Sequence, residues 1–339
     1  MMARTSPPRA TPTVVVWASD PADVTLPHGL GAAEVVVAGA DTIEREIADA
    51  DVVLAADFSV QDPERVWRRA TRARWIHIRG TGVDHLLTPA LVGHPAVLTN
   101  GRGCFDRTIA EFVLMQLLAL AKGLPGQLRA QAERSWRPRC GGRLDEARVL
   151  VIGPGAIGSA IAGLVSAIGV QVDGAGRNPR PPRSGFGRIR PTGDLASYVG
   201  DYDYVVVAAP LTNETRHLVD AAVLGSMKPS ARLINVARGA VVDEQALVAA
   251  LRAGTIGGAA LDVFETEPLP RESELWRMPN VIVTPHMAGD FAGWLDWQYR
   301  LFAENYARFV AGQPLRNVVD KKLGYVIDPG HVESEEYRS

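Results

Sequence analysis

Cysteine is scarce in this sequence, whose 339 residues include only Cys104 and Cys140. Two cysteines cannot staple a chain of this length, so a disulfide scaffold is excluded and a reducing compartment, the cytoplasm, is favoured. Neither cysteine has the spacing to histidines that a zinc site requires. We therefore expect no bound metal ion.

Net charge is also nearly absent. The 36 lysines and arginines face 38 aspartates and glutamates, which leaves a formal charge of −2. This balance provides no overall field to attract a nucleic-acid backbone or an anionic membrane. We expect neither as a partner, so recognition must depend on local groups.

Uncharged stretches long enough to cross a membrane are equally rare. Val149 to Val172 is one, but its glycines and its proline predict a strand, a turn and a helix instead. The start, Met1 to Thr13, lacks the apolar stretch of a signal peptide and predicts a frayed leader. With 47% hydrophobic and 22% charged residues, the chain has ordinary globular composition, and its length predicts two domains.

The sequence does contain a regular alternation of short β-branched runs with helix-compatible stretches, which predicts parallel sheets covered by helices. The first series of predicted strands is Val14–Trp17, Val35–Val37, Val52–Leu54, Trp75–Ile78 and Ala96–Leu98. The second series is Val149–Ile152, Val170–Val172, Tyr204–Ala208, Leu233–Val236, Gly258–Leu261 and Val281–Val283. Two doubly wound sheets are therefore expected.

The segments outside the strands have simpler patterns. Thr108 to Leu120 is apolar-rich and predicts a long buried helix that links the two sheets, and Trp294 to Val310 predicts another helix. Arg137 to Arg143 is rich in arginine, proline and glycine, which predicts a loop. The polar tail, Asp320 to Ser339, is expected to be mobile.

A glycine-rich turn follows the first strand of the second series. Gly153, Gly155 and Gly158 form the pattern G-x-G-x-x-G between that strand and the apolar-periodic run Ser159 to Ile168. In this position the first glycine permits a tight turn, the second lets a pyrophosphate approach the backbone, and the third lets helix and strand pack closely. The amides at the helix start then hold the phosphates. The turn therefore predicts a dinucleotide site.

The residues after the next strand decide which nicotinamide cofactor fits. An acid there binds the ribose 2′-hydroxyl, whereas arginine accommodates a 2′-phosphate. Gly176 and Arg177 stand at the expected strand tip, followed by Arg180 and Arg183. Asp173 is the competing candidate, but we expect it to lie inside the strand. The arginines favour NADPH, and a solvated loop without cofactor contacts is the alternative.

Four polar side chains follow the later strands of the second series: Arg238, Asp262, Glu267 and His286. Because the carboxyl ends of parallel strands border the ligand crevice, these groups are expected to converge there. Arginine can hold a substrate carboxylate with two hydrogen bonds, histidine can transfer a proton near neutral pH, and a carboxylate can orient the imidazole. With a nicotinamide as hydride carrier, this set suits the reduction of a 2-oxo acid.

The same segments resemble a known family. Asn235 to Gly239 (NVARG), Leu261 to Pro270 (LDVFETEPLP) and Thr284 to His286 (TPH) are similar to motifs of the D-isomer-specific 2-hydroxyacid dehydrogenases, and the similarity extends from about residue 14 to 318. The resemblance implies an α/β fold with two doubly wound parallel-sheet domains, in which a Rossmann cofactor domain is inserted into a flavodoxin-like substrate domain. The substrate domain would comprise residues 1–105 and 290–339, and the cofactor domain residues 106–289.

Roles for individual residues follow from this resemblance. Arg238 is expected to bind and polarise the 2-oxo acid, His286 to be the acid/base, and Glu267 to be the partner of the histidine. Glu265 is then a bystander, because the family's carboxylate stands immediately before the proline, here Pro268.

The resemblance extends to the first domain and to the cofactor. Gly80, Thr81 and Gly82 match the substrate loop whose amides hold the carboxylate, with a plain turn as the alternative. The run from Gly176 resembles the glyoxylate/hydroxypyruvate reductase branch, which favours NADPH. The expected cofactor contacts are Gly153, Gly155, Ala156, Ile157, Gly158, Arg177, Asn178, Arg180, Pro210 and Asp262, the last facing the nicotinamide carboxamide.

The remaining residues considered are a tryptophan, an aspartate and four histidines. Trp136 matches a region where family dimers exchange contacts, so a homodimer is expected. Ordinary interface packing is the favoured role of that tryptophan, and an approach to the neighbouring subunit's active site is the alternative. Asp290 departs from the family pattern, which has a small hydroxyl-bearing or apolar residue four positions after the histidine. The remaining histidines considered are expected to be surface or loop residues: His77, His85, His94 and His217.

These observations predict an NADPH-preferring cytoplasmic enzyme that reduces a glyoxylate- or hydroxypyruvate-like 2-oxo acid to the D-2-hydroxy acid, with His286 as proton donor. NADH is the alternative cofactor. The first alternative function is an NAD-dependent phosphoglycerate or phosphite dehydrogenase, which uses the same three residues. The second is a dinucleotide-sensing corepressor with negligible turnover, because fold alone does not decide function.

Overall fold

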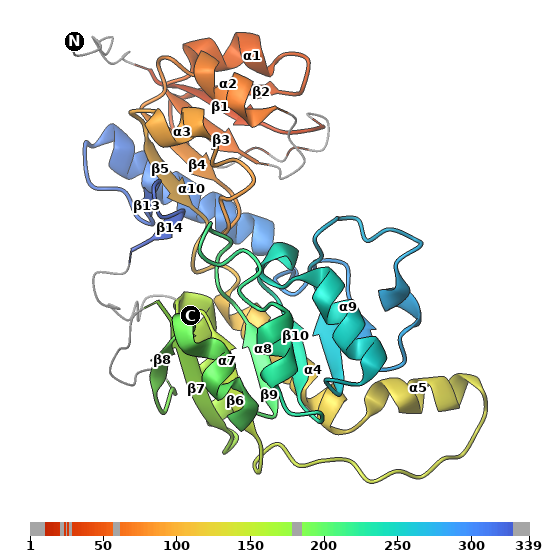
Figure 1. Cartoon of the computed structure of the whole chain (residues 1–339). Coiled ribbons are helices and arrows are strands. Elements are labelled where there is room, and N and C mark those ends of the chain that lie inside the picture. The colour runs from red at the N-terminus through yellow and green to blue at the C-terminus, as the bar shows by residue number, and fades with distance from the viewer. Residues whose placement is uncertain are drawn as a thin grey trace. The chain divides into compact units, whose positions relative to one another are not determined.

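The computed structural model describes residues 11–20, 24, 26, 29–56, 62–177 and 185–327. The chain divides into two compact units (Figure 1). The first unit comprises residues 1–102 and 293–339, and the second unit comprises residues 103–292. The junctions predicted at 105/106 and 289/290 therefore fall at 102/103 and 292/293.

The first unit is built on a parallel sheet in the order β2-β1-β3-β4-β5. Its strands are β1 (Thr13–Trp17), β2 (Glu34–Ala38), β3 (Val52–Ala55), β4 (Trp75–Ile78) and β5 (Val97–Asn100). Every residue of β1, β3 and β4 is buried, as expected for a parallel sheet with helices on both faces. This strand order is the flavodoxin-like one, as predicted.

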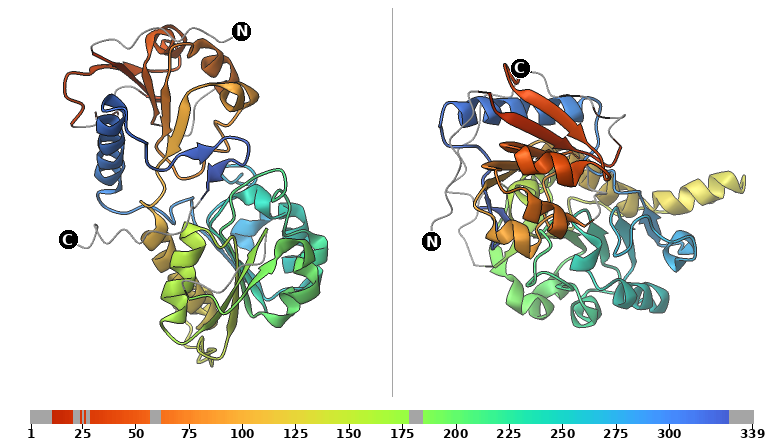
Figure 2. Two further views of the ribbon diagram at one scale, coloured as in Figure 1. Left: turned by 90° about the vertical axis from the view of Figure 1, so that its left-hand side faces the viewer. Right: turned by 90° about the horizontal axis from the view of Figure 1, so that it is seen from above.

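Helices cover both faces of this sheet (Figures 1 and 2). They are α1 (Ile43–Glu46), η2 (Ile47–Asp49), α2 (Pro63–Arg69), α3 (Pro89–Gly93) and α10 (Trp294–Val310). On one face, Trp67 of α2 packs edge-on against Trp17, with ring centroids 5.2 Å apart. On the other face, Phe302 of α10 stacks on Trp75 at 4.8 Å.

The tail differs in part from its prediction. Val319–Asp320 (β13) pairs antiparallel with Tyr325–Val326 (β14), and Asp320 Oδ1 accepts hydrogen bonds from the backbone N–H groups of Lys322 and Leu323. The expectation of a mobile tail is therefore wrong for this hairpin, because its turn provides local partners for the backbone. Residues 328–339, like residues 1–10 of the predicted leader, lie outside the described ranges, and Thr13 already belongs to β1.

The second unit has a parallel sheet in the order β12-β11-β10-β9-β6-β7-β8. Its strands are β6 (Arg148–Ile152), β7 (Gln171–Gly176), β8 (Ile189–Pro191), β9 (Tyr204–Val207), β10 (Arg232–Asn235), β11 (Gly258–Leu261) and β12 (Val281–Val283). The chain order reverses between β6 and β9, and the ligand crevice of such a sheet lies outside the carboxyl ends of the strands at that point. The second unit therefore has the Rossmann arrangement, as predicted.

Helices also cover both faces of this second sheet. The helices of the second unit are α4 (Asp106–Ala121), α5 (Leu124–Ala132), α6 (Ala156–Ser166), η3 (Thr192–Asp194), α7 (Leu195–Tyr198), η4 (Val199–Asp201), α8 (Ala221–Ser226), η5 (Gly239–Val241), α9 (Glu244–Ala253) and η6 (Glu274–Arg277). α4 confirms the predicted buried helix and packs with α6 in one core. Helix α9 is capped at its start by Asp243, whose side chain accepts a hydrogen bond from the Ala246 N–H, and at its end by Gly254, which has a φ of +70°; both residue types are common at helix caps.

Two segments are long enough and apolar enough to be compared with a membrane-spanning helix. Val149 to Val172 forms β6, the glycine-rich turn, α6 and the start of β7, as predicted. Among the described residues no single helix is long and apolar enough to cross a membrane, and α4 and α5 reach that length only together, with a bend of 68° between them. Helix α5 and the chain after it project from the rest of the second unit (Figures 1 and 2), and the predicted loop at 137–143 lies there.

Candidate active site

The glycine-rich turn joins β6 to α6 in the second unit, and close contacts require two of its three glycines. Gly153 has a φ of +97°, and a Cβ there would lie 2.6 Å from Ala209. A Cβ on Gly158 would lie 2.1 Å from the Gly153 carbonyl oxygen, whereas Gly155 has open space around it. No side chain caps α6, so its first amides, those of Ala156 and Ile157 included, are available to a ligand. The turn therefore fits a pyrophosphate.

The tip of β7 is formed by Gly176, which packs against the ring of Pro154. Arg177 follows, and its Nη2 lies 3.6 Å from Glu214 Oε2. The loop that holds Glu214 begins at Pro210, whose carbonyl accepts a hydrogen bond from the Thr215 hydroxyl at 2.6 Å. Asn178, Arg180 and Arg183 lie outside the described residues.

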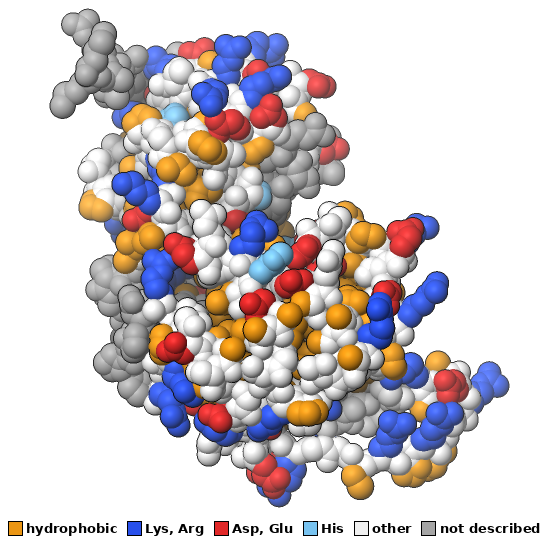
Figure 3. Space-filling view, in the orientation of Figure 1, with side chains coloured by type: hydrophobic (Ala, Val, Ile, Leu, Met, Phe, Trp, Pro, Cys, Tyr) orange, Lys and Arg blue, Asp and Glu red, His pale blue; other side chains and the backbone are white. Residues whose placement is uncertain are grey.

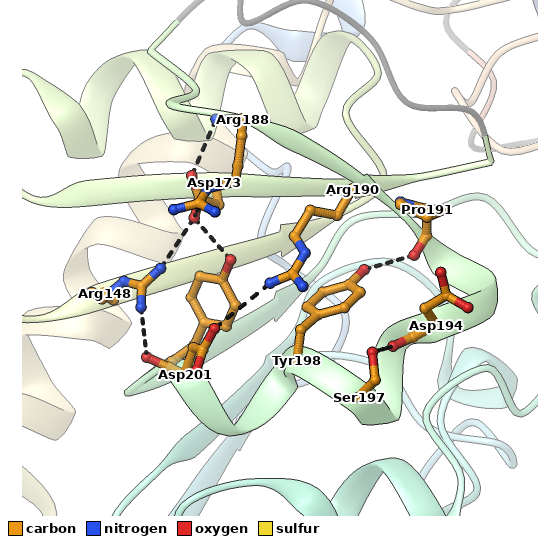
Figure 4. Close-up of polar contacts among 10 residues, drawn as sticks. Arg148, Asp173, Arg188, Arg190, Pro191, Asp194, Ser197, Tyr198 and Asp201 are labelled. Carbon is orange, nitrogen blue, oxygen red and sulfur yellow. Dashed lines mark hydrogen bonds and ion pairs between the residues drawn. The ribbon is translucent and has the colours of Figure 1, made fainter.

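Asp173 lies inside β7, as expected, and its side chain is only 12% exposed. Its carboxylate accepts hydrogen bonds from the Tyr202 hydroxyl at 2.8 Å and from the Arg188 N–H at 3.1 Å (Figure 4). The guanidinium of Arg148 lies 3.4 Å away. Asp173 is therefore engaged within the unit, which weakens its candidacy for a ribose hydroxyl.

Arg238 follows β10 and is the residue before the short helical turn η5. The Asn235 side chain fixes this segment, because its Nδ2 donates to the Arg238 carbonyl at 3.0 Å and its Oδ1 accepts from the Ala237 N–H at 3.1 Å. Gly239 is required next, since a Cβ there would lie 1.9 Å from the Phe264 carbonyl carbon. The turn after β10 therefore lies directly against the turn after β11.

His286 and Glu267 form a pair at the ends of β12 and β11. His286 Nδ1 lies 2.7 Å from Glu267 Oε2, and the two side chains are 48% and 35% exposed. Burial opposes ionisation of the carboxyl, but hydrogen bonds from His286 and the Phe264 N–H, together with the charges of His286 and Arg238, outweigh it and lower the pKa of Glu267. Because Glu267 uses Nδ1, Nε2 is the ring nitrogen left to exchange a proton with a ligand.

Asp262 accepts hydrogen bonds from the backbone next to His286. It is 2% exposed; Oδ1 accepts from the Thr284 hydroxyl at 2.6 Å and the Met287 N–H at 3.0 Å, and Oδ2 accepts from the Ala288 N–H at 2.8 Å. These bonds fix the turn in which His286 has a φ of +52°. The predicted contact of Asp262 with the nicotinamide stays a prediction.

Asp290 adds a further carboxylate near this turn. Burial raises the pKa of the Asp290 carboxyl, the charge of His286 opposes that rise, and the charge of Asp262 adds to it. Asp290 is thus within electrostatic range of both residues. In Figure 3, histidine and acidic side chains lie together on the surface of the second unit above α8 and β10.

Gly80, Thr81 and Gly82 belong to the first unit and follow β4. The Gly80 carbonyl accepts a hydrogen bond from the Gly101 N–H at 2.9 Å, and the Thr81 carbonyl accepts one from Asn100 Nδ2 at 2.6 Å. The segment is therefore tied to the end of β5. Its role toward a substrate stays a prediction.

The histidines outside the site differ from their prediction in one case. His77 is fully buried in β4, where Nδ1 lies 2.8 Å from the Thr99 hydroxyl. The surface or loop assignment is therefore wrong for His77, because a neighbouring strand supplies a hydrogen bond that lets the ring be buried. His94 follows α3, and its Nε2 lies 2.8 Å from the Ala70 carbonyl. In the part of the chain that the structure describes, no group of three or more His, Cys, Asp or Glu could hold a metal ion.

One side-chain pairing was not predicted. His217 Nε2 lies 2.9 Å from Glu265 Oε1, so the glutamate taken for a bystander has a histidine partner of its own. No sequence signal marks this contact, since it joins two loops that are 48 residues apart.

A glycine-rich turn that fits a pyrophosphate, with Arg238, Glu267 and His286 beyond the carboxyl ends of one Rossmann sheet, is the arrangement expected of a dinucleotide-dependent dehydrogenase. Comparison with known proteins agrees. The NAD-binding domain of the D-isomer specific 2-hydroxyacid dehydrogenases matches residues 114–288. The chain is 30% identical over 302 residues to glyoxylate reductase of Thermococcus gammatolerans, which covers 86% of this chain and 89% of the relative. The chain therefore belongs to the D-isomer specific 2-hydroxyacid dehydrogenase family and is an oxidoreductase.

Two further similarities mark the range of activities in the family. Over 229 residues the chain is 34% identical to D-3-phosphoglycerate dehydrogenase of a Synechocystis species; the match covers 66% of this chain but only 40% of that longer protein. The crystal structure of an NADPH-dependent glyoxylate/hydroxypyruvate reductase from Sinorhizobium meliloti, in complex with NADP and sulfate, aligns with a TM-score of 0.79 at 28% identity and covers 93% of this chain and 100% of that one.

Proposed function

We propose that this protein is an NADPH-preferring reductase of a small 2-oxo acid of the glyoxylate or hydroxypyruvate type, and that its product is the D-2-hydroxy acid. The observation that carries the proposal is the 2.7 Å pair of His286 and Glu267 within electrostatic range of Arg238. The names of the Thermococcus and Sinorhizobium relatives support the substrate class.

The chemistry follows from the donors at this site. A bound nicotinamide supplies the hydride. Arg238 holds the carboxylate and polarises the carbonyl oxygen, which gains negative charge as the reaction proceeds. His286, protonated and oriented by Glu267, donates its Nε2 proton to that oxygen. The part of Gly80, Thr81 and Gly82 in holding the carboxylate rests on the family resemblance.

The cofactor preference rests on Arg177. Its guanidinium is 47% exposed and faces Glu214 across 3.6 Å, a separation at which an exposed ion pair contributes little. A ribose 2′-phosphate would offer Arg177 a stronger, charge-assisted partner. NADPH is therefore the preferred cofactor, with Asn178 and Arg180 as further predicted contacts.

The test is a panel of 2-oxo acids assayed with NADPH and NADH in parallel. We expect turnover of glyoxylate or hydroxypyruvate, a higher kcat/KM with NADPH, and about a tenfold selective loss with NADPH in Arg177→Ala. Arg252→Ala, which removes an exposed arginine paired with Glu274, is the control and should change the efficiency with neither cofactor. Equal efficiency with both cofactors in the unmodified enzyme contradicts the preference. Oxidation of 3-phosphoglycerate alone would favour the phosphoglycerate dehydrogenase alternative, and dinucleotide binding without any turnover would favour the corepressor.

We also propose that the projecting segment 124–143 forms a homodimer with a second copy of the chain. Helix α5 has no buried residue, and Leu128 and Trp136 are 55% and 95% exposed. Figure 3 shows hydrophobic side chains on this projection among basic ones. Such side chains normally find cover in an interface. Light scattering should show a dimer that Trp136→Ala with Leu128→Glu converts to a monomer; an unchanged mass would contradict this interface. A cytoplasmic location stays a prediction.

A further inference from the structure

A second histidine–carboxylate pair lies in the second unit, formed by His217 and Glu265 at 2.9 Å. It is separate from the pair formed by Glu267 and His286. We propose that His217 is a positioning residue that fixes the turn carrying Arg238 and the turn carrying Glu267 relative to one another. This inference rests on the proposed function in taking Arg238 and Glu267 as the residues that act on the substrate.

The main chain of His217 is bonded to the turn that carries Arg238. The His217 N–H donates to the Ala240 carbonyl at 2.8 Å, and two residues on the Val219 N–H donates to the Val241 carbonyl at 3.1 Å. Ala240 and Val241 belong to η5, which begins immediately after Arg238. The loop after β9 is therefore attached to the arginine segment through its backbone.

The imidazole of His217 is bonded to the turn that carries Glu267. Glu265 Oε1, which faces His217, also accepts a hydrogen bond from the Glu244 N–H at 3.3 Å. In return, Glu244 Oε2 accepts one from the Glu265 N–H at 3.0 Å. Glu265 is thus held by its backbone and its side chain, two residues before Glu267.

The two turns are already in contact, so a shift in one reaches the other. Gly239 lies against the Phe264 backbone so closely that no Cβ fits, and the Phe264 N–H donates to Glu267 Oε1 at 2.9 Å. His217 bridges both turns from outside, through its backbone on one side and its ring on the other. Its φ of +53° is one that few non-glycine residues adopt, and strain of this kind persists where the surroundings fix it.

Removal of the ring should loosen the catalytic geometry without removing any group that touches the ligands. A small misplacement of catalytic groups lowers the reaction rate strongly. We therefore expect His217→Ala to lower kcat for 2-oxo acid reduction about tenfold while the Kd for NADPH changes less than twofold. His217→Gln carries an amide N–H that can replace the Nε2 contact to Glu265, so it should recover most of the rate. His94→Ala, which removes a ring contact to the Ala70 carbonyl in the first unit, is the control and should leave kcat unchanged.

Hydrogen exchange read by mass spectrometry provides a test that needs no substrate. Peptides that cover residues 238–241 and 264–267 should exchange faster in His217→Ala than in the unmodified protein or in His217→Gln, with no change in His94→Ala. If the unmodified protein reduces no 2-oxo acid, the proposed function fails and the exchange alone decides the positioning role. Unchanged exchange in both peptides overturns the inference, as does a kcat loss in His217→Gln as large as that in His217→Ala.

Discussion

Asp173→Asn tests whether the acid in β7 is structural or binds the cofactor. The carboxylate accepts hydrogen bonds from the Tyr202 hydroxyl and the Arg188 N–H, and it faces the Arg148 guanidinium. Asparagine keeps one carbonyl oxygen for the Arg188 N–H. Its amide nitrogen, however, replaces the oxygen that faces Tyr202 and Arg148, so these two contacts are lost.

The magnitude follows from burial. A hydrogen bond to a charged group contributes about 1.5–3 kcal/mol to the free energy of unfolding. The Tyr202 contact is buried, so water screens it little and its contribution should lie in this range. The Arg148 and Arg188 side chains are 31% and 62% exposed, and water screens such pairs, so they add little. The tyrosine hydroxyl can rotate to accept from the new amide, which offsets part of the loss. We expect the free energy of unfolding to fall by about 2 kcal/mol.

Urea unfolding at pH 7 measures this loss, with Asp145→Asn as the control. Asp145 is 45% exposed and paired with Arg143, and a substitution of this kind usually changes stability by less than about 0.5 kcal/mol. The ratio of kcat/KM for NADPH and NADH should stay within twofold of the unmodified value in Asp173→Asn. A stability change no larger than that of the control would refute the structural role, and a shift of the cofactor ratio towards NADPH would show that Asp173 reaches the ribose.

Three further predictions concern Arg238, Glu267 and His77. Arg238→Lys keeps the charge but not the planar fork, so kcat/KM for reduction should fall about a hundredfold or more while cofactor binding survives; near-native reduction by the folded variant would make Arg238 structural. Glu267→Gln removes the carboxylate that orients the His286 ring at 2.7 Å, so kcat for reduction should fall about tenfold or more while NADPH binding is unchanged; a kcat near the unmodified value, with chemistry shown to be rate-limiting by a deuterated cofactor, would exclude the partnership. Burial lowers the pKa of His77 to about 3, so only the unfolded chain takes up this proton between about pH 6.5 and that value. The free energy of unfolding should therefore lose about 1.4 kcal/mol per pH unit through this range, and His77→Asn should remove that part of the slope in urea titrations at pH 7, 6 and 5; equal slopes in the two proteins would contradict it.

Much of the fold could be predicted because the strands of both sheets are short apolar runs with glycine-rich or polar boundaries. β8 could not, since its sequence, Ile189 to Pro191, has no apolar pattern and pairs with β7 over only three residues. His77 was misassigned because its burial depends on the Thr99 hydroxyl from the neighbouring strand, a contact that composition does not reveal.

The site residues were predictable to the extent that they follow strand ends in short motifs. The hydrogen bonds that fix the backbone around these residues were not predictable. Asp262 accepts three hydrogen bonds from the segment after β12, and His217 contacts a loop far away in the sequence. Such contacts depend on which loops the order of the strands brings side by side, and the spacing of residues along the chain does not reveal this order.

The contact of Gly176 with Pro154 limits how this enzyme can be redesigned. To move a dehydrogenase of this kind towards NADH, an acid is introduced at the tip of the second strand, where it can bind the ribose hydroxyls. Here a Cβ at position 176 would lie 2.9 Å from Pro154 Cγ and 3.1 Å from its Cδ, and a proline ring has little freedom to move aside. Any side chain at that position displaces the turn proposed to hold the pyrophosphate, so we expect the binding of both cofactors to weaken together. A change of cofactor preference must therefore begin one residue later, at Arg177.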